Sequence, residues 1–361
     1  MKKNLDIVFL LPRFSGGGAE RVIINLLTEL HNRGYLVGIM VFDKSGPLLS
    51  SVPHDVRIYD LCTKSLRSSI VPLLQKIHQL RPKVIFSTFG YINVALLIFR
   101  RFLPKKTKIW IREANLPSVS LANNSWPRLM TVLYRFFYRK SDKLICSSIV
   151  MKNEFILNFL VTDHLIEVLP NPVDVDKIYA SSVPKKCFDK DGVRYVAAGR
   201  LVYQKGFDRL LYWFSKLSNK KSTLVILGDG NLKSELIKKS ELLDIQDRVK
   251  FLGFCDNPWQ WYAGADVFLL SSRWEGMPNS VLEALACGTP VIATEESGGI
   301  REITRYSKDD SVVVATESQF IHAMNKVKIQ DKNIQLSSLL PSRYEKKNVT
   351  SIIEIWLSDL P

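Results

Sequence analysis

Cysteine is scarce in this sequence, and the cysteines that occur are not spaced as metal ligands. The 361 residues include five cysteines, an odd number, and no two of them form a CxxC pair or another metal-binding spacing. This pattern does not fit a zinc module or a framework of paired disulfides. It favours thiols that stay reduced, as they do in the cytoplasm.

Long apolar runs are also missing. The longest uncharged apolar stretch, GYINVALLIF at residues 90–99, has about half of the roughly 20 residues that a membrane-spanning helix needs. Two lysines follow Met1, and an apolar segment follows them, interrupted by Asp6 and the pair Pro12-Arg13. Such interruptions are typical of a first β-strand and not of a signal peptide. We therefore expect a cytoplasmic protein whose contact with a membrane is peripheral.

Acidic residues are few in the first half of the chain. Residues 1–170 hold 24 Lys and Arg against 11 Asp and Glu, a net charge of +13, whereas residues 171–361 hold 26 against 24, a net charge of +2. A basic first half is expected to face an anionic ligand or surface. A nucleic acid is one such partner, but the sequence has no helix-turn-helix, zinc or RNP pattern, so nucleic-acid binding is kept only as an alternative.

Short apolar runs alternate with amphipathic segments along the whole chain. This alternation predicts parallel β-sheets in α/β layers. The expected strands are residues 5–11, 36–42, 83–88, 108–113 and 143–148 in the first half, followed by VRYVAAG, TLVILGDG, RVKFLGF, ADVFLLSS and TPVIAT in the second. The predicted fold class is therefore α/β, with two Rossmann-like, doubly wound domains that face a central cleft.

A proline-containing polar stretch, LPNPVDVDKIYASSVPKK at residues 169–186, marks the domain boundary. The chain is also longer than one hydrophobic core usually covers. We predict a first domain at residues 1–170, a second domain at 171–345, and a C-terminal helix at 346–361 that crosses back to the first domain. Because open α/β sheets bind ligands at the carboxyl ends of their strands, the site is expected in the cleft.

Two glutamates, Glu275 and Glu283, bracket the segment EGMPNSVLE. A structural explanation exists for the second of them, because Ser280 and Glu283 have the spacing of a capping box at a helix start. That explanation does not account for Glu275, which is expected in a loop. The segment therefore indicates more than the beginning of a helix.

Three features together indicate a site for a diphosphate. A helix that begins near Ser280 offers N–H groups and the positive end of its dipole to an anion. Arg200 and Lys205 follow the strand in VRYVAAG, at the carboxyl edge of the second sheet. Residues 16–18, three glycines in a row, allow the first domain to approach a phosphate at a helix start of its own. Each feature is weak alone, and their repetition at equivalent sheet edges favours one shared ligand.

The segment SRWEGMPNSVLEALACGTPVIAT closely resembles the donor site of the family 4 retaining glycosyltransferases, which have the GT-B fold. SGGGAERVIINL, LPNPVD, AAGRLVYQKGFDRLL and ILGDG resemble other stretches of that family in the expected order. The resemblance covers most of the chain, and the segment between the two glutamates is its most specific part.

The resemblance implies roles for the matching residues. Glu283 would accept hydrogen bonds from both ribose hydroxyls of a nucleotide, and Glu275 would accept one from the transferred sugar. Arg200 and Lys205 would neutralise the diphosphate, which leaves with negative charge while the sugar becomes oxocarbenium-like. These two cations and Glu275 form the expected catalytic group. The other expected donor contacts are Gly17, Gly18, Phe254, Gly276, Met277, Pro278, Asn279, Ser280 and Val281.

The chain departs from the family pattern where many relatives have a histidine that contacts the sugar. The segments KVIFSTFG and IWIREANLPS contain no histidine. Arg112, Glu113 and Asn115 occupy the corresponding strand end, as in a subset of the family that builds bacterial surface polysaccharides. We expect one of them to meet the sugar or the acceptor, and a structural role for this loop is the alternative. No catalytic base is identified.

Basic and aromatic residues are interleaved in SWPRLMTVLYRFFYRK at residues 125–140, and FRRFLPKKTK at 99–108 adds further cations. A basic, aromatic helix is able to lie in an anionic membrane interface. The alternative is an ordinary helix that packs its aromatic side chains on the sheet. In members of the family, the first domain also binds the acceptor, often an undecaprenyl diphosphate-linked saccharide in the inner leaflet.

The sequence therefore predicts a retaining hexosyltransferase, without a metal or another cofactor, at the inner face of the cytoplasmic membrane. It would move a hexose or N-acetylhexosamine from a nucleotide-diphosphate sugar, expected to be a UDP-sugar, to an undecaprenyl diphosphate-linked saccharide during assembly of a capsule, exopolysaccharide or O-antigen. The alternatives are a nucleotide-sugar epimerase or a phosphorylase on the same scaffold, a binding protein with a disabled site, and a basic nucleic-acid-binding protein.

Overall fold

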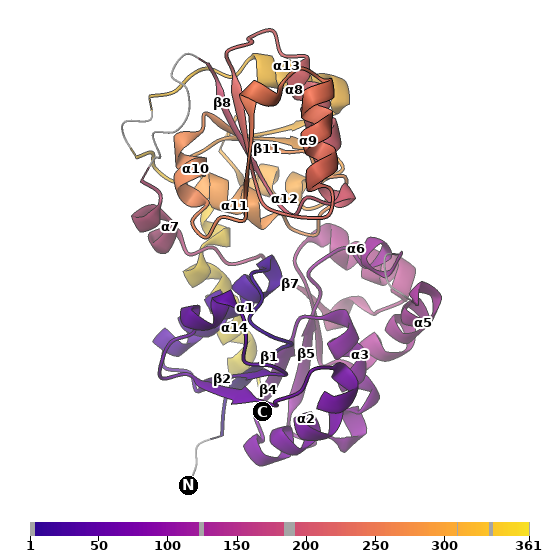
Figure 1. Cartoon of the computed structure of the whole chain (residues 1–361). Coiled ribbons are helices and arrows are strands. Elements are labelled where there is room, and N and C mark those ends of the chain that lie inside the picture. Colours follow the sequence, from indigo (N-terminus) through magenta and orange to yellow (C-terminus); the bar gives the residue numbers. More distant parts are fainter. Residues whose placement is uncertain (1–3, 123–125, 184–191, 309, 332–334, 361) are drawn as a thin grey trace. The chain divides into compact units, whose positions relative to one another are not determined.

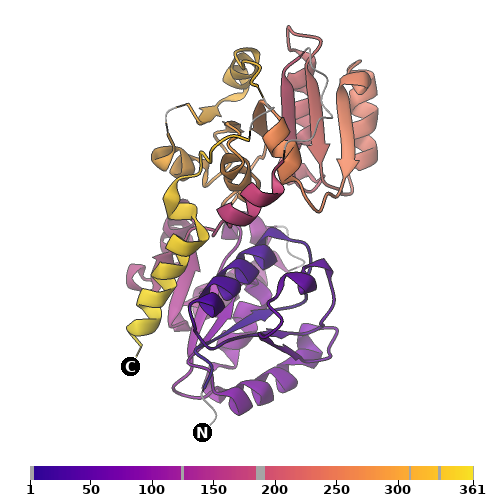
Figure 2. The same cartoon turned by 90° about the vertical axis from the view of Figure 1, so that its left-hand side faces the viewer.

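The chain folds into two compact units (Figures 1 and 2). The computed structural model describes residues 4–122, 126–183, 192–308, 310–331 and 335–360. The first unit comprises Met1–Pro172 together with Lys346–Pro361, and the second unit is Val173–Glu345. The first division between the units therefore falls after residue 172, compared with the boundary predicted after residue 170.

Within the described residues, the first unit has a seven-stranded sheet in the order β3-β2-β1-β4-β5-β6-β7, and all neighbouring strands are parallel. Its strands are β1 (Ile7–Leu11), β2 (Val37–Val41), β3 (Arg57–Asp60), β4 (Val84–Ser87), β5 (Lys108–Arg112), β6 (Lys143–Cys146) and β7 (Ile166–Val168). Its α-helices are α1 (Gly18–Asn32), α2 (Leu66–Leu80), α3 (Gly90–Ile98), α4 (Pro117–Ala122), α5 (Pro127–Phe137), α6 (Ile149–Phe159) and α14 (Lys346–Ser358). Its 3-10 helices are η1 (Pro47–Ser51), η2 (Arg100–Phe102), η3 (Tyr138–Lys140) and η4 (Asp163–Leu165).

Alternate residues of the central strand β1 face two separate cores. Ile7, Phe9 and Leu11 pack into the core that also contains residues of α1 and α14, whereas Val8 and Leu10 pack into the core that contains residues of α2, α3, α5 and α6. Successive side chains of a strand point to opposite faces, so a parallel sheet covered on both faces needs apolar residues at nearly every position. This requirement explains why the strands appear in the sequence as continuous apolar runs.

α14 completes the core of the first unit although it lies at the end of the chain. It runs beside α1, as Figure 1 shows. Trp356 of α14 packs edge-on against Trp110 of β5, with the ring centroids 5.7 Å apart. Arg33, at the end of α1, pairs with Glu354 of α14 and lies 3.0 Å from Glu29. The C-terminal helix is therefore a structural part of the first unit.

The second unit has a six-stranded parallel sheet within the described residues, in the order β10-β9-β8-β11-β12-β13. Its strands are β8 (Arg194–Ala198), β9 (Thr223–Leu227), β10 (Val249–Gly253), β11 (Val267–Leu270), β12 (Val291–Thr294) and β13 (Val312–Ala315). Its α-helices are α7 (Val175–Ser181), α8 (Phe207–Ser215), α9 (Lys233–Leu242), α10 (Trp259–Gly264), α11 (Asn279–Ala286), α12 (Ile300–Tyr306) and α13 (Glu317–Asn325). Its 3-10 helices are η5 (Tyr203–Lys205), η6 (Gln246–Arg248) and η7 (Ser342–Tyr344).

Both sheets reverse their strand order at one point. In the first unit β1 lies between β2 and β4, and in the second unit β8 lies between β9 and β11. The loops that leave the carboxyl ends of the central strands diverge there, and doubly wound sheets bind ligands at this switch point. The predicted fold class, α/β with two Rossmann-like doubly wound domains, is confirmed.

Candidate active site

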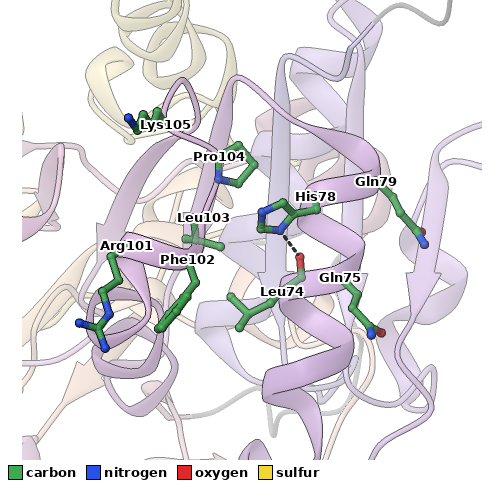
Figure 3. Close-up of a pocket in the computed structure, with 9 residues that line it drawn as sticks. All are labelled: Leu74, Gln75, His78, Gln79, Arg101, Phe102, Leu103, Pro104 and Lys105. Carbon is green, nitrogen blue, oxygen red and sulfur yellow. Dashed lines mark hydrogen bonds between the residues drawn. The ribbon is translucent and has the colours of Figure 1, made fainter.

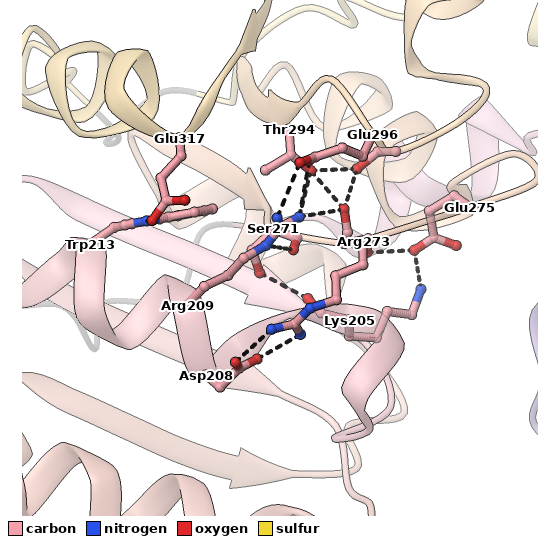
Figure 4. A network of polar contacts seen from close by, with 12 residues as sticks. Lys205, Asp208, Arg209, Trp213, Ser271, Arg273, Glu275, Thr294, Glu296 and Glu317 are labelled. Atoms are coloured by element: carbon pink, nitrogen blue, oxygen red, sulfur yellow. Dashed lines mark hydrogen bonds and ion pairs between the residues drawn. The ribbon is translucent and has the colours of Figure 1, made fainter.

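The loops that follow β8 and β11 meet at the switch point of the second unit (Figure 4). Lys205 Nζ, in the loop after β8, lies 2.5 Å from Glu275 Oε1, in the loop after β11. Ser272 Oγ donates to the same carboxylate oxygen over 2.7 Å, and Ser271 Oγ donates to the carbonyl oxygen of Lys205 over 2.9 Å. Glu275 is only 5% exposed. The structure therefore brings together two of the three residues that are predicted to act in catalysis.

Arg200, the third of these residues, stands near the start of the loop that carries Lys205. It follows β8 by two positions, and its carbonyl oxygen accepts a hydrogen bond from the N–H of Val202 over 2.8 Å. Its side chain is exposed, in contrast to the enclosed carboxylate of Glu275. The same loop thus offers one cation held in an ion pair and a second cation in contact with solvent.

Two arginines that the sequence analysis does not single out hold these loops together (Figure 4). Arg273 makes two hydrogen bonds to Asp208, over 2.8 and 2.7 Å, and donates to the carbonyl oxygen of Tyr203 over 2.7 Å. Arg209 donates to the carbonyl oxygen of Ser271 over 2.9 Å. Burial by itself raises the pKa of Asp208, but the hydrogen bonds from Arg273 outweigh it and lower that pKa below its usual value. The only sequence signal for these residues is their charge within segments already assigned to the site.

Two glycines allow the loops to approach one another closely. Gly206 has a φ of +63°, and a Cβ there would lie 2.1 Å from the carbonyl oxygen of Ser271. Gly298, after β12, has a φ of +55°, and a Cβ there would lie 1.9 Å from the carbonyl oxygen of Glu275. Both separations are far shorter than a van der Waals contact, and other residues rarely adopt this backbone conformation. A larger residue at either position would displace the loop that carries Glu275.

α11 begins two residues earlier than the capping-box interpretation requires. Its first residue is Asn279, and Pro278 precedes it without a side-chain cap. Ser280 therefore lies inside the first turn and Glu283 in the second turn, where Glu283 Oε2 accepts a hydrogen bond from Trp259 Nε1 over 3.3 Å. The capping-box explanation of Glu283 is wrong, because the proline and not the serine precedes the first helical residue. The N-terminal end of α11 retains the dipole that favours an anion.

The remaining donor contacts predicted in the second unit differ in their exposure. Gly276 and Pro278 are buried in the loop before α11, and Met277 and Val281 are part of the hydrophobic core. The ligand contacts predicted for these four residues would therefore be made by backbone groups. Phe254, which directly follows β10 at the edge of the sheet, is 57% exposed and presents an aromatic surface there.

In the first unit, Gly17 and Gly18 mark the beginning of α1, in the connection that follows β1. Gly17 is the residue before the helix, and Gly18 is its first residue. A Cβ at Gly17 would lie 2.5 Å from Glu20 Oε2, and Glu20 is buried. The predicted helix start is therefore present, and its binding of an anion stays a prediction; a carboxylate lies beside it, which the sequence analysis does not foresee.

Arg112 and Glu113 lie inside the first unit at the end of β5. Arg112 is 1% exposed and donates to Thr88 Oγ1 over 3.0 Å and to Asn171 Oδ1 over 2.5 Å, and Glu113 is 4% exposed. Burial lowers the pKa of Arg112 to about 10 and raises the pKa of Glu113 to about 7. Both side chains are enclosed among residues of the first unit, and Asn115 is exposed. The expectation that one of the three meets the sugar or the acceptor stays a prediction.

α5 has a buried side and an exposed side, and the membrane interpretation of the basic, aromatic segment stays a prediction. Ser125 lies outside the described residues. Tyr134 is buried in the core of the first unit, as an ordinary packing helix requires. Another side of the helix carries large exposed apolar side chains at helical spacing. We call these residues the exposed face of α5: Trp126, Leu129, Val132 and Phe136.

A groove of about 940 Å³ lies elsewhere in the first unit (Figure 3). It is formed by the last turns of α2, by η2 and by the segment that follows η2. His78 within it donates to the carbonyl oxygen of Leu74 over 2.9 Å. Both segments lead into the amino ends of the strands that follow them, β4 and β5. Because ligands of doubly wound sheets bind at the carboxyl ends, this groove is not the candidate site.

Among the described residues, no group of three or more His, Cys, Asp or Glu side chains is arranged to hold a metal ion. The helices in the same part of the chain include none that combines the length and the apolar character needed to cross a membrane.

Two family profiles match the chain, one in each half. The profile described as Glycosyltransferase Family 4 matches residues 16–177, and the profile described as Glycosyl transferases group 1 matches residues 182–336. The chain belongs to this family of glycosyltransferases. The second match includes the Lys205–Glu275 pair and α11, so the geometry described above belongs to the segment that the family shares.

Curated relatives are similar over different shares of their length. An uncharacterized glycosyltransferase of Methanocaldococcus jannaschii is 30% identical over 64% of this chain, and the match spans 60% of that protein, less than two thirds. The N-acetylgalactosamine-N,N'-diacetylbacillosaminyl-diphospho-undecaprenol 4-alpha-N-acetylgalactosaminyltransferase of Campylobacter jejuni is 28% identical over 80% of each chain. An amylovoran biosynthesis glycosyltransferase of Erwinia amylovora is 25% identical over 92% of this chain and 89% of that protein.

A solved structure supports the fold assignment. HepE of Anabaena in complex with UDP-glucose is similar to this chain with a TM-score of 0.78, over 98% of this chain and 99% of that chain, at 19% identity. At this level of identity the likeness concerns the fold alone. This glycosyltransferase therefore has the GT-B fold predicted from its sequence.

Proposed function

We propose that this glycosyltransferase is a retaining hexosyltransferase that moves a hexose or N-acetylhexosamine from a UDP-sugar to an undecaprenyl diphosphate-linked saccharide in the assembly of a bacterial surface polysaccharide. The observation that carries the proposal is the ion pair of Lys205 and Glu275 at the switch point of the second unit. The finer points have support from similar proteins. The Campylobacter relative is named for a diphospho-undecaprenol substrate, the Erwinia relative for amylovoran biosynthesis, and HepE was solved with UDP-glucose.

Lys205 and Arg200 bind the donor diphosphate in this proposal. Glu275 holds the ammonium group of Lys205. A diphosphate carries more negative charge than one carboxylate, so we expect Lys205 to turn to it and to release Glu275 Oε1 as an acceptor for a sugar hydroxyl. When the bond between the anomeric carbon and the diphosphate breaks, negative charge grows on the leaving group. The two cations stabilise that charge at a partly enclosed site.

Glu283 holds the ribose of the nucleotide in the same proposal. Its side chain is half-buried, and Trp259 fixes one of its carboxylate oxygens through the 3.3 Å hydrogen bond. A carboxylate has several acceptor positions, so it can accept from two vicinal hydroxyl groups in addition to the indole N–H. The contact with Trp259 thus orients the carboxylate and leaves part of its capacity for the ribose.

The chain makes its membrane contact through the exposed face of α5. The apolar side chains Trp126, Leu129, Val132 and Phe136 are accompanied by two exposed cations of the same helix, Arg128 and Arg135. Apolar residues beside cations are suited to the interface of an anionic lipid surface, where the rings enter the headgroup region and the charges meet the phosphates. This placement would bring the protein to an acceptor that is held in the membrane.

A direct test begins with the donor. Thermal shifts of the protein with UDP-, GDP- and ADP-sugars should show stabilisation by UDP-sugars, because a ligand that binds only the folded state raises the melting temperature. The best donor is then supplied with an undecaprenyl diphosphate-linked N-acetylhexosamine in anionic vesicles, and the product is examined for transfer with retained anomeric configuration. Inversion at the anomeric carbon, or interconversion of UDP-sugars without transfer, would contradict the proposal.

A further inference from the structure

Glu113 is the centre of a buried polar cluster in the first unit. Its Oε1 accepts a hydrogen bond from Asn93 Nδ2 of α3 over 3.0 Å, from the hydroxyl of Tyr134 in α5 over 3.3 Å, and from the hydroxyl of Tyr138 in η3. Asn93 Nδ2 also donates to the carbonyl oxygen of Arg112 over 3.0 Å. One carboxylate oxygen therefore joins the end of β5 to three helical segments.

The surroundings of this cluster are apolar and aromatic. The rings of Tyr134 and Tyr138 are stacked with their centroids 4.0 Å apart, and Phe155 of α6 lies 5.6 Å from the Tyr138 ring. The neighbouring cation, Arg112, directs its guanidinium to Thr88 and Asn171 and not to Glu113. Burial of a carboxyl group among apolar side chains lowers the free energy of unfolding unless hydrogen-bond donors satisfy its oxygens. An apolar residue would therefore serve a purely structural role better at this position.

α5 reaches Glu113 from one side and faces outward from another. Tyr134 and Tyr138 place their hydroxyls on the carboxylate, whereas the exposed face of α5 lies away from the core. Glu113 is followed directly by the loop that contains the exposed Asn115 and leads into α4. The N–H of Glu113 donates to the carbonyl oxygen of Ile145 in β6, which fixes the beginning of this loop to the sheet edge. The side chain of Glu113 is thus one of the contacts between the outward helix and the residue from which this loop starts.

We propose that Glu113 is a positioning residue through which α5 sets the conformation of residues 114–118, the loop and the first residues of α4, so that a lipid surface bound to the exposed face of α5 orders the edge of the sheet next to it. The lipid part of this inference rests on the proposed function. The link between helix and loop does not depend on lipid, because its hydrogen bonds are present in the chain alone.

Hydrogen exchange of the intact protein measures this link directly. The double variant Tyr134→Phe/Tyr138→Phe keeps both rings and removes both donors to Glu113. Without lipid, we expect exchange of the amides at residues 114–116 and 118 to become about five-fold faster or more in this variant, since local opening of a segment becomes easier when the hydrogen bonds that hold it are lost. Glu113→Gln keeps an acceptor oxygen and should exchange like the natural protein. Tyr195→Phe removes another buried hydroxyl, which donates to Met324 over 2.8 Å in the second unit, and is the matched control.

Vesicles of phosphatidylglycerol and phosphatidylcholine supply the lipid arm of the experiment. In the natural protein they should slow exchange in α5 and also at residues 114–118. In the double variant they should protect α5 alone. Equal protection of the loop in both proteins, or an unchanged loop in the lipid-free variant, would overturn the inference. Natural protein that does not sediment with vesicles would contradict the lipid contact of the proposed function, and the lipid-free comparison would still decide the role of Glu113.

Discussion

The two units have the same order of their central strands but use charge at the carboxyl ends of their strands in opposite ways. In the second unit, Lys205 and Glu275 pair in loops outside the sheet, and Arg200 is exposed beside them. In the first unit, Arg112 and Glu113 at the end of β5 are enclosed and bonded to neutral partners. In the proposed function the second unit offers its charges to a ligand, whereas those of Arg112 and Glu113 are bonded within the first unit.

Lys205→Ala tests the charged side of this comparison, with the largest expected effect. We expect kcat to fall by about 10²- to 10³-fold, the size typical for loss of one preorganised group at a developing anion, with a smaller change in UDP affinity. Steady-state release of UDP measures kcat, and calorimetric titration with UDP measures the affinity. Lys220→Ala, at an exposed position of the same unit, should leave kcat unchanged. Equal activity of Lys205→Ala and the control would remove Lys205 from the site.

Glu113→Gln tests the enclosed side. Burial raises the pKa of Glu113 from its ordinary 4.5 to about 7, so the folded protein binds this proton more tightly than the unfolded chain. The corresponding stability is fully present below pH 4.5 and is lost as the pH rises through about 7, a change of about 3 kcal/mol. The variant lacks this dependence. Urea unfolding should therefore show it more stable than the natural protein at pH 8 and not at pH 4.5.

A carboxylate on the surface provides the control for that measurement. Glu235→Gln, at an exposed position of α9, should follow the natural protein at every pH. A stability difference between Glu113→Gln and the natural protein that stays constant from pH 4.5 to pH 8 would show that Glu113 does not titrate in this range.

Glu283→Ala sharpens the comparison within the second unit, because it separates nucleotide binding from chemistry. Loss of charged hydrogen bonds to the ribose should weaken UDP binding by about 10- to 100-fold. Calorimetric titration with UDP measures the change. Glu295→Ala, which removes an exposed carboxylate after β12, is the control. UDP affinity equal to that of the control would place the ribose elsewhere.

Arg128→Gln probes the outward side of the first unit and has a smaller expected effect. One cation near an anionic surface contributes about 1 kcal/mol, so vesicle binding at low salt should weaken by about five-fold. Cosedimentation with phosphatidylglycerol vesicles checks this value. Arg67→Gln, exposed on α2, should bind as the natural protein does. The α5 contact would be refuted if both variants lost the same affinity.

Removal of metal ions should have the smallest effect. In the proposed reaction Arg200 and Lys205 supply the positive charge at the diphosphate, so we expect EDTA to leave transfer unchanged. The assay compares initial rates with EDTA, and with EDTA followed by excess manganese. Activity that is abolished by the chelator and restored by the metal would mean that these two cations are not sufficient.

The strands that the sequence pattern missed are all at sheet edges. β3 and β7 are the outer strands of the first sheet, and β13 is an outer strand of the second. β3 has no buried residue, and β7 has three residues, so neither forms a marked apolar run. Central parallel strands are covered on both faces and are therefore readable as apolar runs, whereas edge strands have fewer neighbours to exclude water.

The candidate site was predictable in its residues but not in its contacts. Lys205 and Glu275 are 70 positions apart and come together because β8 and β11 are neighbours at the switch point. The bonds of Arg273 to Asp208 depend on the same neighbourhood. Arg112 and Glu113 stand at a strand end that the sequence identifies, yet their burial follows from how α3 and α5 pack there.

The sequence by itself determined the alternation of strands and helices, the uneven charge and the family, because these depend on local apolar patterns, composition and short motifs. Only the tertiary structure decided which charges pair with one another, which are enclosed, and which side of α5 meets solvent. Those outcomes depend on strand order and on the packing of residues distant in the chain. This packing excludes water from some charged side chains and leaves others exposed, and so decides whether a charge is available to a ligand or is bonded within the fold.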